Sequence, residues 1–278
     1  MPKIVRTVAE LRGALRDAGG RIAMVPTMGA LHAGHIALVT EAAKHADKTL
    51  VSIFVNPTQF APNEDFDAYP RTLDADLEKL GSAADIVFAP SAREIYPQGY
   101  ATTITVGGPS AGLETDFRPH FFSGVATVVA KLLLAATPDV AVFGEKDYQQ
   151  LLVVKQLVRD LALPVKIIGA PTLREADGLA LSSRNAYLSD NERSVAAKLN
   201  VILKAAIAQA RATGDLSAAE TQAMTALKQA GFDAVDYVAI RDAQSLAALT
   251  ALDRPARILA AARVGKTRLI DNMAVESV

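Results

Sequence analysis

Two histidines spaced three apart, His32 and His35, are the side chains of this sequence best suited to chemistry. They lie in the segment PTMGALHAGH (26–35), which follows a short apolar run at 21–25 and precedes a helical stretch that begins at Ile36. Residues three apart project from one face of a helix. A strand, a glycine turn and a helix N-terminus also form an anion site, because free backbone N–H groups and the positive end of the helix dipole face the ligand. The segment therefore predicts a phosphate site with two imidazoles beside it.

The ordinary alternative for such a pair is a surface or core position, since most His-x-x-His pairs on helices have no chemical role. Placement after a strand favours function, because ligands bind outside the carboxyl ends of strands in open α/β sheets. The spacing H-x-G-H is similar to that of the nucleotidyl-transfer superfamily that includes class I aminoacyl-tRNA synthetases, where paired imidazoles contact the phosphates of ATP. Gly34 fits this interpretation, because a side chain there would obstruct the nucleotide.

The segment FVNPTQF (54–60) follows the β-rich run 49–55. Its Asn56 and Gln59 are neutral amides that can donate and accept hydrogen bonds. Neutral amides suit a hydroxy acid whose carboxylate must remain nucleophilic. An Asn-Pro turn followed by a solvent-exposed amide is the alternative interpretation.

The segment FGEKDYQQ (143–150) has the same order of strand end, glycine, charged residues and helix. Lys146 could neutralise a phosphate as a compact point charge. Asp147 could cap the helix or contact a nucleotide. Gln149 and Gln150 are consecutive and face differently, so at most one should touch a given ligand. A charged N-terminal turn without a ligand is equally compatible with this pattern.

A third polar loop, DGLALSSRN (177–185), supplies two hydroxyls and a guanidinium. Such a group can form a phosphate clamp that closes on a bound ligand and opens after release. Ser-Ser-Arg also occurs in ordinary loops. In RPHFFSGV (118–125), entry into an apolar helix is the favoured interpretation for every residue except Arg118.

The composition limits the classes of protein. The chain has 278 residues, a formal net charge of −1 and no cysteine. The near-neutral charge argues against a nucleic-acid binder, which would carry a basic stripe. The lack of cysteine excludes disulfides, zinc–thiolate sites and thiol catalysis. No apolar run is long enough to span a membrane, and the N-terminal segment lacks the apolar core of a signal peptide. We expect a soluble cytoplasmic protein.

Short apolar strands alternate with helices over the first 175 residues, which indicates an α/β fold with a mostly parallel, doubly wound sheet. The expected strands are 21–25, 49–55, 85–88, 139–143 and 165–169, and the expected helices are 34–46, 71–81, 121–136 and 147–161, together with one opened by a capping box of Thr7 and Glu10. Residues 176–278 predict a smaller α+β domain. It should contain a long helix from the Ser189–Glu192 capping box to about 212, a helix at 217–230, and β-like runs at 236–241, 257–263 and 267–270.

The four motifs in this order closely resemble the pantoate–β-alanine ligases, and TRLIDN (267–272) resembles the end of that family's chains. The resemblance covers essentially the whole chain. It implies a Rossmann-like domain (1–175), a C-terminal lid domain (176–278) and a homodimer. It also implies a two-step reaction, in which the carboxylate of (R)-pantoate attacks the α-phosphorus of ATP and the amine of β-alanine then attacks the pantoyl adenylate. Such chemistry needs positioning and charge stabilisation more than a protein nucleophile.

The resemblance also implies roles for individual residues. His35 would be the acid group, with His32, Lys146 and Arg184 as its catalytic partners on the phosphates. Gln59 and Gln150 would hold pantoate. The residues implied in ATP binding are Met28, Gly29, Ala30, Leu31, His32, Ala33, Gly34, His35, Gly144, Glu145, Lys146, Asp147, Leu173, Leu181, Ser182, Ser183 and Arg184. Mg²⁺ would bridge the ATP phosphates with few protein ligands, none of which is assigned here.

The sequence departs from the family pattern at two places. The family has R-P-G-H-F where this chain has RPHFF (118–122), so no role is transferred to His120. The acidic stretch after YPRT is interrupted by Ala75, so Asp76 is given no part in the metal site. Two alternatives stay open. One is a cytidylyl- or adenylyltransferase on the same scaffold, which would call for basic residues near Gln59 where the chain has amides. The other is a non-catalytic nucleotide-binding module.

Overall fold

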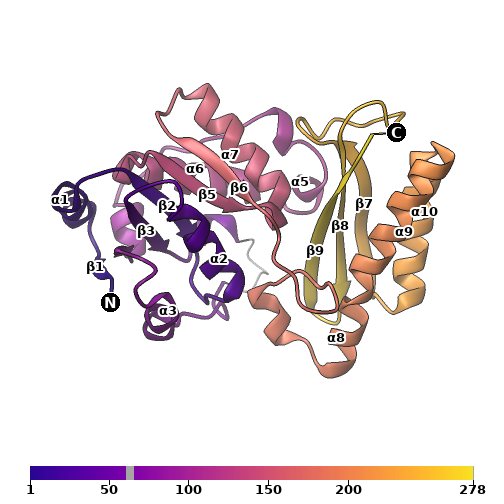
Figure 1. Cartoon of the computed structure of the whole chain (residues 1–278), viewed down its shortest axis with the longest axis horizontal. Coiled ribbons are helices and arrows are strands. Elements are labelled where there is room, and N and C mark those ends of the chain that lie inside the picture. Colours follow the sequence, from indigo (N-terminus) through magenta and orange to yellow (C-terminus); the bar gives the residue numbers. More distant parts are fainter. Residues whose placement is uncertain (61–65, 278) are drawn as a thin grey trace.

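A computed structural model describes residues 1–60 and 66–277 of the chain. Its larger sheet has six strands in the order β1-β4-β3-β2-β5-β6 (Figure 1). All neighbouring strands in this sheet pair in parallel. The strands are β1 (Lys3–Val5), β2 (Ile22–Thr27), β3 (Lys48–Ile53), β4 (Ile86–Phe88), β5 (Val140–Gly144) and β6 (Lys166–Ala170). The expected α/β class with a parallel sheet is confirmed.

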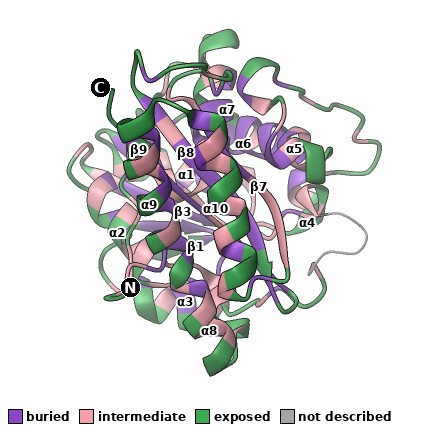
Figure 2. Cartoon of the chain, turned by 90° about the vertical axis from the view of Figure 1, so that its right-hand side faces the viewer, coloured by how far each residue is buried: buried purple, intermediate pink, exposed green. Residues whose placement is uncertain are grey.

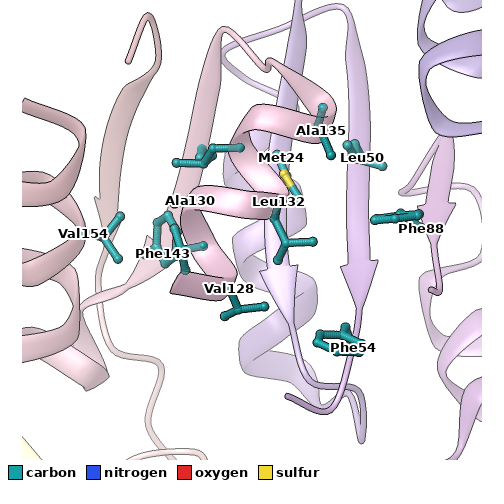
Figure 3. Close-up of a cluster of buried hydrophobic side chains, with 14 of the residues drawn as sticks. Met24, Leu50, Phe54, Phe88, Val128, Ala130, Leu132, Ala135, Phe143 and Val154 are labelled. Carbon is teal, nitrogen blue, oxygen red and sulfur yellow. The ribbon is translucent and has the colours of Figure 1, made fainter. Parts of the chain in front are cut away.

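Helices cover both faces of this sheet. One face packs against α1 (Val8–Ala18), α6 (Phe121–Ala136) and α7 (Tyr148–Asp160), and the other against α2 (Ala33–Ala42) and α3 (Leu73–Leu80). Side chains alternate between the two faces along each strand, so Met24 joins the first cluster while Val25 joins the second. Figure 3 shows α6 lying over Met24 and Leu50. Burial on both faces explains why these strands are continuously apolar.

The strand order places a ligand crevice between β2 and β5. From β2 the chain builds outward through β3 and β4, and it then crosses back to β5 on the other side of β2. Such a reversal leaves an opening at the carboxyl ends of the two central strands, where ligands bind in open α/β sheets. The segments that follow β2 and β5 are the histidine motif and the Lys146 motif.

The C-terminal part contains an antiparallel sheet of β7 (Ala234–Asp242), β8 (Ala256–Val264) and β9 (Thr267–Val275). Helices α9 (Lys198–Thr213) and α10 (Leu216–Ala230) pack on one face of it. Their outer faces are exposed (Figure 2). The opposite face of this sheet is turned toward the parallel-sheet part (Figure 1).

The structure differs from the sequence-based expectation in several elements, of which three bear on the architecture. Strand β1 was not expected, because three residues are too few to show a pattern. The expected helix from 189 to 212 is divided into α8 (Asp190–Ala196) and α9. Helix α2 ends at Ala42, before the expected residue 46. Both capping boxes are present as predicted. The boundary at 175/176 stays a prediction and falls between β6 and α8.

Candidate active site

A cavity of about 1080 Å³ opens where β2 and β5 end, and the C-terminal part closes over it. All four motifs contribute to its lining, so residues far apart in the chain meet at one site. The expected residues that line it are Met28, His32, Gly34, His35, Gln59, Gly144, Lys146, Asp147, Gln150, Leu173, Leu181, Ser182, Ser183 and Arg184.

Some expected ATP-site residues do not line this cavity, namely Gly29, Ala30, Leu31, Ala33 and Glu145. Leu31 is 1% exposed because its side chain packs in the core between α2 and the sheet. The Glu145 carboxylate turns away to pair with Arg257 at 3.1 Å. The side chains of Leu31 and Glu145 therefore support the segments that form the site and do not line the cavity. His120 is exposed and lies outside the lining.

The two motif histidines lie side by side, with ring centroids 4.1 Å apart. The Nδ1 atom of His32 accepts a hydrogen bond from Gly34 N (3.1 Å), and that of His35 accepts one from His32 N (3.3 Å). A neutral ring that accepts through Nδ1 carries its hydrogen on Nε2. A Cβ at Gly34 would lie 2.8 Å from the His32 ring, so glycine is needed there for the imidazole itself.

Both imidazoles are neutral at physiological pH. Burial, and after it the adjacent His32, lower the pKa of His35 to about 3. Burial, and after it the nearby ammonium of Lys146, lower the pKa of His32 to about 4. The pair thus offers two N–H donors without charge, and Lys146 supplies the positive charge.

Asp76 of α3 holds the turn that leads into the histidine motif. It is fully buried, and its carboxylate accepts hydrogen bonds from the backbone N–H groups of Ala30 (3.0 Å) and Leu31 (2.7 Å). One turn later, Lys79 donates to the Leu31 carbonyl at 2.7 Å. Asp76 is thus committed to the backbone groups of this turn. The available sequence signal was a carboxylate at an inward position of α3, where helical periodicity expects an apolar residue.

Gln59 is held at the cavity by Asn56. The Asn56 amide is 1% exposed and donates to Gln59 Oε1 (3.1 Å) and to the Gly124 carbonyl (3.2 Å). A Cβ at Gly124 would lie 2.3 Å from the carbonyl oxygen of Thr58, so only glycine lets α6 approach the short helix η1 (Pro57–Gln59) this closely. Asn56 and Gln59 both line the cavity, and Asn56 also fixes the position of Gln59.

The consecutive glutamines on α7 have separate tasks, as the sequence indicated. Gln149 is 5% exposed, and its amide bonds the backbone of Glu114, Pro109 and Gly112. Gln150 makes no such contact in the described part of the chain and lines the cavity. Gln149 therefore fixes the loop beside the site, and Gln150 is the one left for a ligand.

The loop at 181–184 lies against the histidine motif. Ser183 Oγ donates to the Ala30 carbonyl (3.2 Å), and Leu181 N donates to the Leu173 carbonyl (3.0 Å). Leu173 is 42% exposed although apolar, which suits contact with a flat base. The loop thus brings Ser182 and Arg184 to the same cavity as the imidazoles.

A buried charge network, missed by sequence reasoning, joins the two parts of the molecule at the cavity. Glu114 accepts from Arg268 of β9 (2.7 Å) and from Arg118 (3.1 Å), and Arg268 also pairs with Asp236 (2.7 Å). Burial raises the pKa of the adjacent Tyr237, and the Glu114 carboxylate adds to the effect. Its members lie far apart in the sequence, so no local pattern reveals it.

Within residues 1–60 and 66–277, no three histidine or acidic side chains gather in a way that could hold a metal ion. The carboxylate of Asp147 lines the cavity, 3.7 Å from the Lys146 ammonium. A divalent cation at this site would therefore take most of its ligands from the nucleotide phosphates and water, which is the usual behaviour of Mg²⁺.

Comparison with known proteins decides the family. The model of the pantoate–β-alanine ligase family matches residues 3–274. The chain belongs to this family. It is 59% identical to a pantothenate synthetase of Mesorhizobium japonicum, over 99% of this chain and 98% of that protein. A pantothenate synthetase of Caulobacter vibrioides is 57% identical, with 99% of both chains covered.

Solved structures agree with this assignment to the ligase family. A pantothenate synthetase of Thermus thermophilus superposes with a TM-score of 0.93 at 47% identity, with 99% of both chains covered. A pantoate–β-alanine ligase of Francisella tularensis, solved with β,γ-ATP and β-alanine, has a TM-score of 0.83 at 37% identity, covering 98% of this chain and 97% of that one. In the described parts of this ligase-family chain, no helix is both long and apolar enough to cross a membrane.

Proposed function

We propose that this chain joins (R)-pantoate and β-alanine to form pantothenate through a pantoyl-adenylate intermediate, with release of pyrophosphate and AMP. The observation that carries the proposal is a single cavity lined by two chemically different groups of residues. One group consists of uncharged imidazole donors and Lys146, and the other of two amides and an apolar wall. That wall includes Phe54, Val125, Val128, Val129, Leu132 and Phe143. It fits the branched carbon of pantoate, while the amides fit its hydroxyls and carboxylate.

In the first step, a pantoate carboxylate oxygen bonds to the α-phosphorus of ATP and the bond from that phosphorus to the pyrophosphate oxygen breaks. Negative charge grows on the phosphate oxygens as this occurs. Donors fixed in advance are well suited to stabilise such charge, because they need no reorganisation. We assign this role to the Nε2–H groups of His32 and His35, to Lys146 and to Arg184.

In the second step, the amine of β-alanine attacks the acyl carbon of the adenylate. The new C–N bond forms, the bond from carbon to the phosphate oxygen breaks, AMP leaves, and the amine gives up a proton. No side chain need act as nucleophile, which agrees with a chain without cysteine. The protein's contribution is to hold both substrates in line and to exclude water.

We further propose that Mg²⁺ accompanies ATP and neutralises phosphate charge, with Asp147 as the protein carboxylate at hand. A homodimer is also a proposal, and it rests on what the family resemblance implies. A cytoplasmic location is proposed as well. Sedimentation of the purified protein tests the dimer.

The deciding experiment measures AMP and pyrophosphate from ATP and Mg²⁺ with pantoate and β-alanine added singly and together. We expect sustained AMP release only with both substrates, and pantothenate identified by mass. If the nucleotide stays attached to the product, the chain is a nucleotidyltransferase. Absence of turnover with bound ATP indicates a different substrate pair or a binding module.

The variants Gln59→Ala and Gln150→Ala test whether these two amides bind pantoate. Each should raise the KM for pantoate by roughly tenfold, in line with the loss of a hydrogen bond or two to a charged ligand, and leave the KM for ATP nearly unchanged. The matched control is Gln149→Ala, which should lower the melting temperature instead. Equal weakening of pantoate and ATP would remove the argument for a pantoate pocket.

A further inference from the structure

The C-terminal segment 267–272 reaches back to the Lys146 turn. Asn272 of β9 is 3% exposed, and its Nδ2 donates to the carbonyl oxygens of Glu145 (2.9 Å) and Lys146 (2.8 Å). Those partners precede it by 127 and 126 residues. One side-chain amide thus holds both carbonyls of the turn that carries the lysine.

The orientation of the Asn272 amide is fixed by Arg257 of β8. Arg257 Nε donates to Asn272 Oδ1 at 2.6 Å, so the oxygen faces the guanidinium and both amide hydrogens face the turn. Arg257 also pairs with the Glu145 carboxylate at 3.1 Å and lies over the Tyr148 ring, 3.8 Å from its centroid. Asn272 is therefore held as a directed double donor.

The turn needs this outside support because it lacks a local cap. It forms a short 3-10 helix, η3 (Glu145–Asp147), whose cap position is Gly144, and no side chain caps it. Asp147 stands at the cap position of α7 but does not cap that helix either. A free turn of this kind would leave the base of the Lys146 side chain loosely placed, and a small misplacement of a reacting or stabilising group is costly in rate.

The preceding residue, Asp271, supports the neighbouring loop in the same way. Its carboxylate binds Arg174 through two bonds of 2.8 Å, and Arg174 donates to the Gly178 carbonyl at 3.0 Å. Gly178 begins the loop that leads to Ser182 and Arg184. Adjacent residues on one strand thus support two separate cavity-lining segments.

We propose that Asn272 is a positioning residue for Lys146, and that it acts through this lysine on adenylate formation. The proposal rests on the proposed ligase function. Turnover of pantoate by the wild-type protein tests that function first, so failure of the two ideas can be told apart.

The test is a single-turnover measurement of pyrophosphate release from ATP and pantoate. Asn272→Ala should slow this step by about 10²-fold, the scale expected for a misplaced catalytic group. Attack of β-alanine on added pantoyl adenylate should be slowed less, because charge there grows only on the single phosphate of the departing AMP and no β- or γ-phosphate is present. Asn272→Asp, of equal size, should slow adenylation as well, because its oxygens would face two carbonyls.

A double-mutant cycle separates positioning from general damage. If Asn272 works through Lys146, Asn272→Ala should cost little further rate in a Lys146→Ala background, since coupled residues are not additive. The matched control is Asn200→Ala, which removes another buried amide-to-carbonyl bond, from Nδ2 to Gly178 O (2.6 Å), and should combine additively with Lys146→Ala. Wild-type adenylation by a folded Asn272→Ala protein would overturn the proposal. So would full additivity with Lys146→Ala, or equal slowing of both half-reactions. Should the alanine variant not fold, the same measurements on Asn272→Asp decide the question.

Discussion

The turn after β2 and the turn after β5 share one local design, in which a parallel strand ends, a polar turn follows and a helix begins. Their support differs. The β2 turn is held by Asp76 and Lys79 of α3, a helix that packs on the same parallel sheet. The β5 turn is held from outside, by Asn272 of the C-terminal sheet. The buried supports of the histidine turn therefore come from the parallel-sheet part, with one further hydrogen bond from Ser183 to the Ala30 carbonyl, whereas the lysine turn is complete only when the C-terminal part is in place.

Removal of Asp76 should produce the largest effect. Asp76→Ala leaves the backbone N–H groups of Ala30 and Leu31 buried without their acceptor, at about 1–3 kcal/mol each in free energy of unfolding. Both Gly29 and Ala30 have positive φ, at 82° and 50°, so this turn has little reason to hold its shape unaided. Adenylation should fall by about 10²-fold as His32 and His35 lose their alignment. Urea unfolding and pyrophosphate release measure the two losses.

The control for that experiment is Asp74→Ala, which changes an exposed acid on the same helix. The stability and adenylation rate of Asp76→Asn should lie between those of the wild type and of Asp76→Ala, because one acceptor oxygen remains. A folded Asp76→Ala protein that forms adenylate at the wild-type rate would show that the β2 turn needs no support from α3.

Hydrogen exchange should separate the two supports directly. In Asp76→Ala, amides over 28–35 should exchange faster, while those over 144–148 keep their protection. Asn272→Ala should give the reverse pattern. With about 1 kcal/mol for each lost hydrogen bond, the exchange rates should rise roughly five- to thirtyfold. Faster exchange of both segments in either variant would mean that the two turns open together.

A pH dependence of the free energy of unfolding also belongs to the β2 turn. Unfolded histidines titrate near pH 6.5, whereas His32 and His35 in the folded chain do so at about 4 and 3. Between these values the unfolded chain binds more protons, so the free energy of unfolding should decrease as the pH falls from about 6.5 toward 4. The double variant His32→Gln, His35→Gln should show a flatter decrease in urea midpoint.

His120→Gln, which changes an exposed histidine outside the cavity, should follow the wild type in that titration. Asn272→Ala should be less stable but should keep the wild-type slope, because its turn contains no imidazole. A wild-type slope in the double histidine variant would assign the pH dependence to other groups.

The sequence could predict what depends on local pattern. Strand β5 and helix α6 were found within a residue or so, because continuous apolar runs mark them. The meeting of the His32, Gln59 and Lys146 segments also followed, since the carboxyl ends of parallel strands share one edge of a sheet.

The remaining features depend on contacts between distant segments. Asp76 binds backbone N–H groups 45 and 46 residues away, and such partners leave no mark on the sequence around them. Glu114 and Arg268 are 154 residues apart and meet only after the two parts of the molecule pack together. A second reason for Gly34 was missed, because a Cβ there would lie 2.8 Å from the His32 ring, while the expected obstruction of the nucleotide stays a prediction.

The register in which β9 pairs with β8 should affect the specific activity of a purified preparation. Asn272 lies opposite Leu259, and Asp271 lies opposite Ala260. Adjacent side chains on a strand point to opposite faces, so a slip of one residue would exchange the two. A carboxylate would then face the carbonyls of the lysine turn. A preparation containing slipped molecules would keep its helical content and size yet lose specific activity, so the catalytic rate per molecule reports strand register in a sheet that carries no catalytic group.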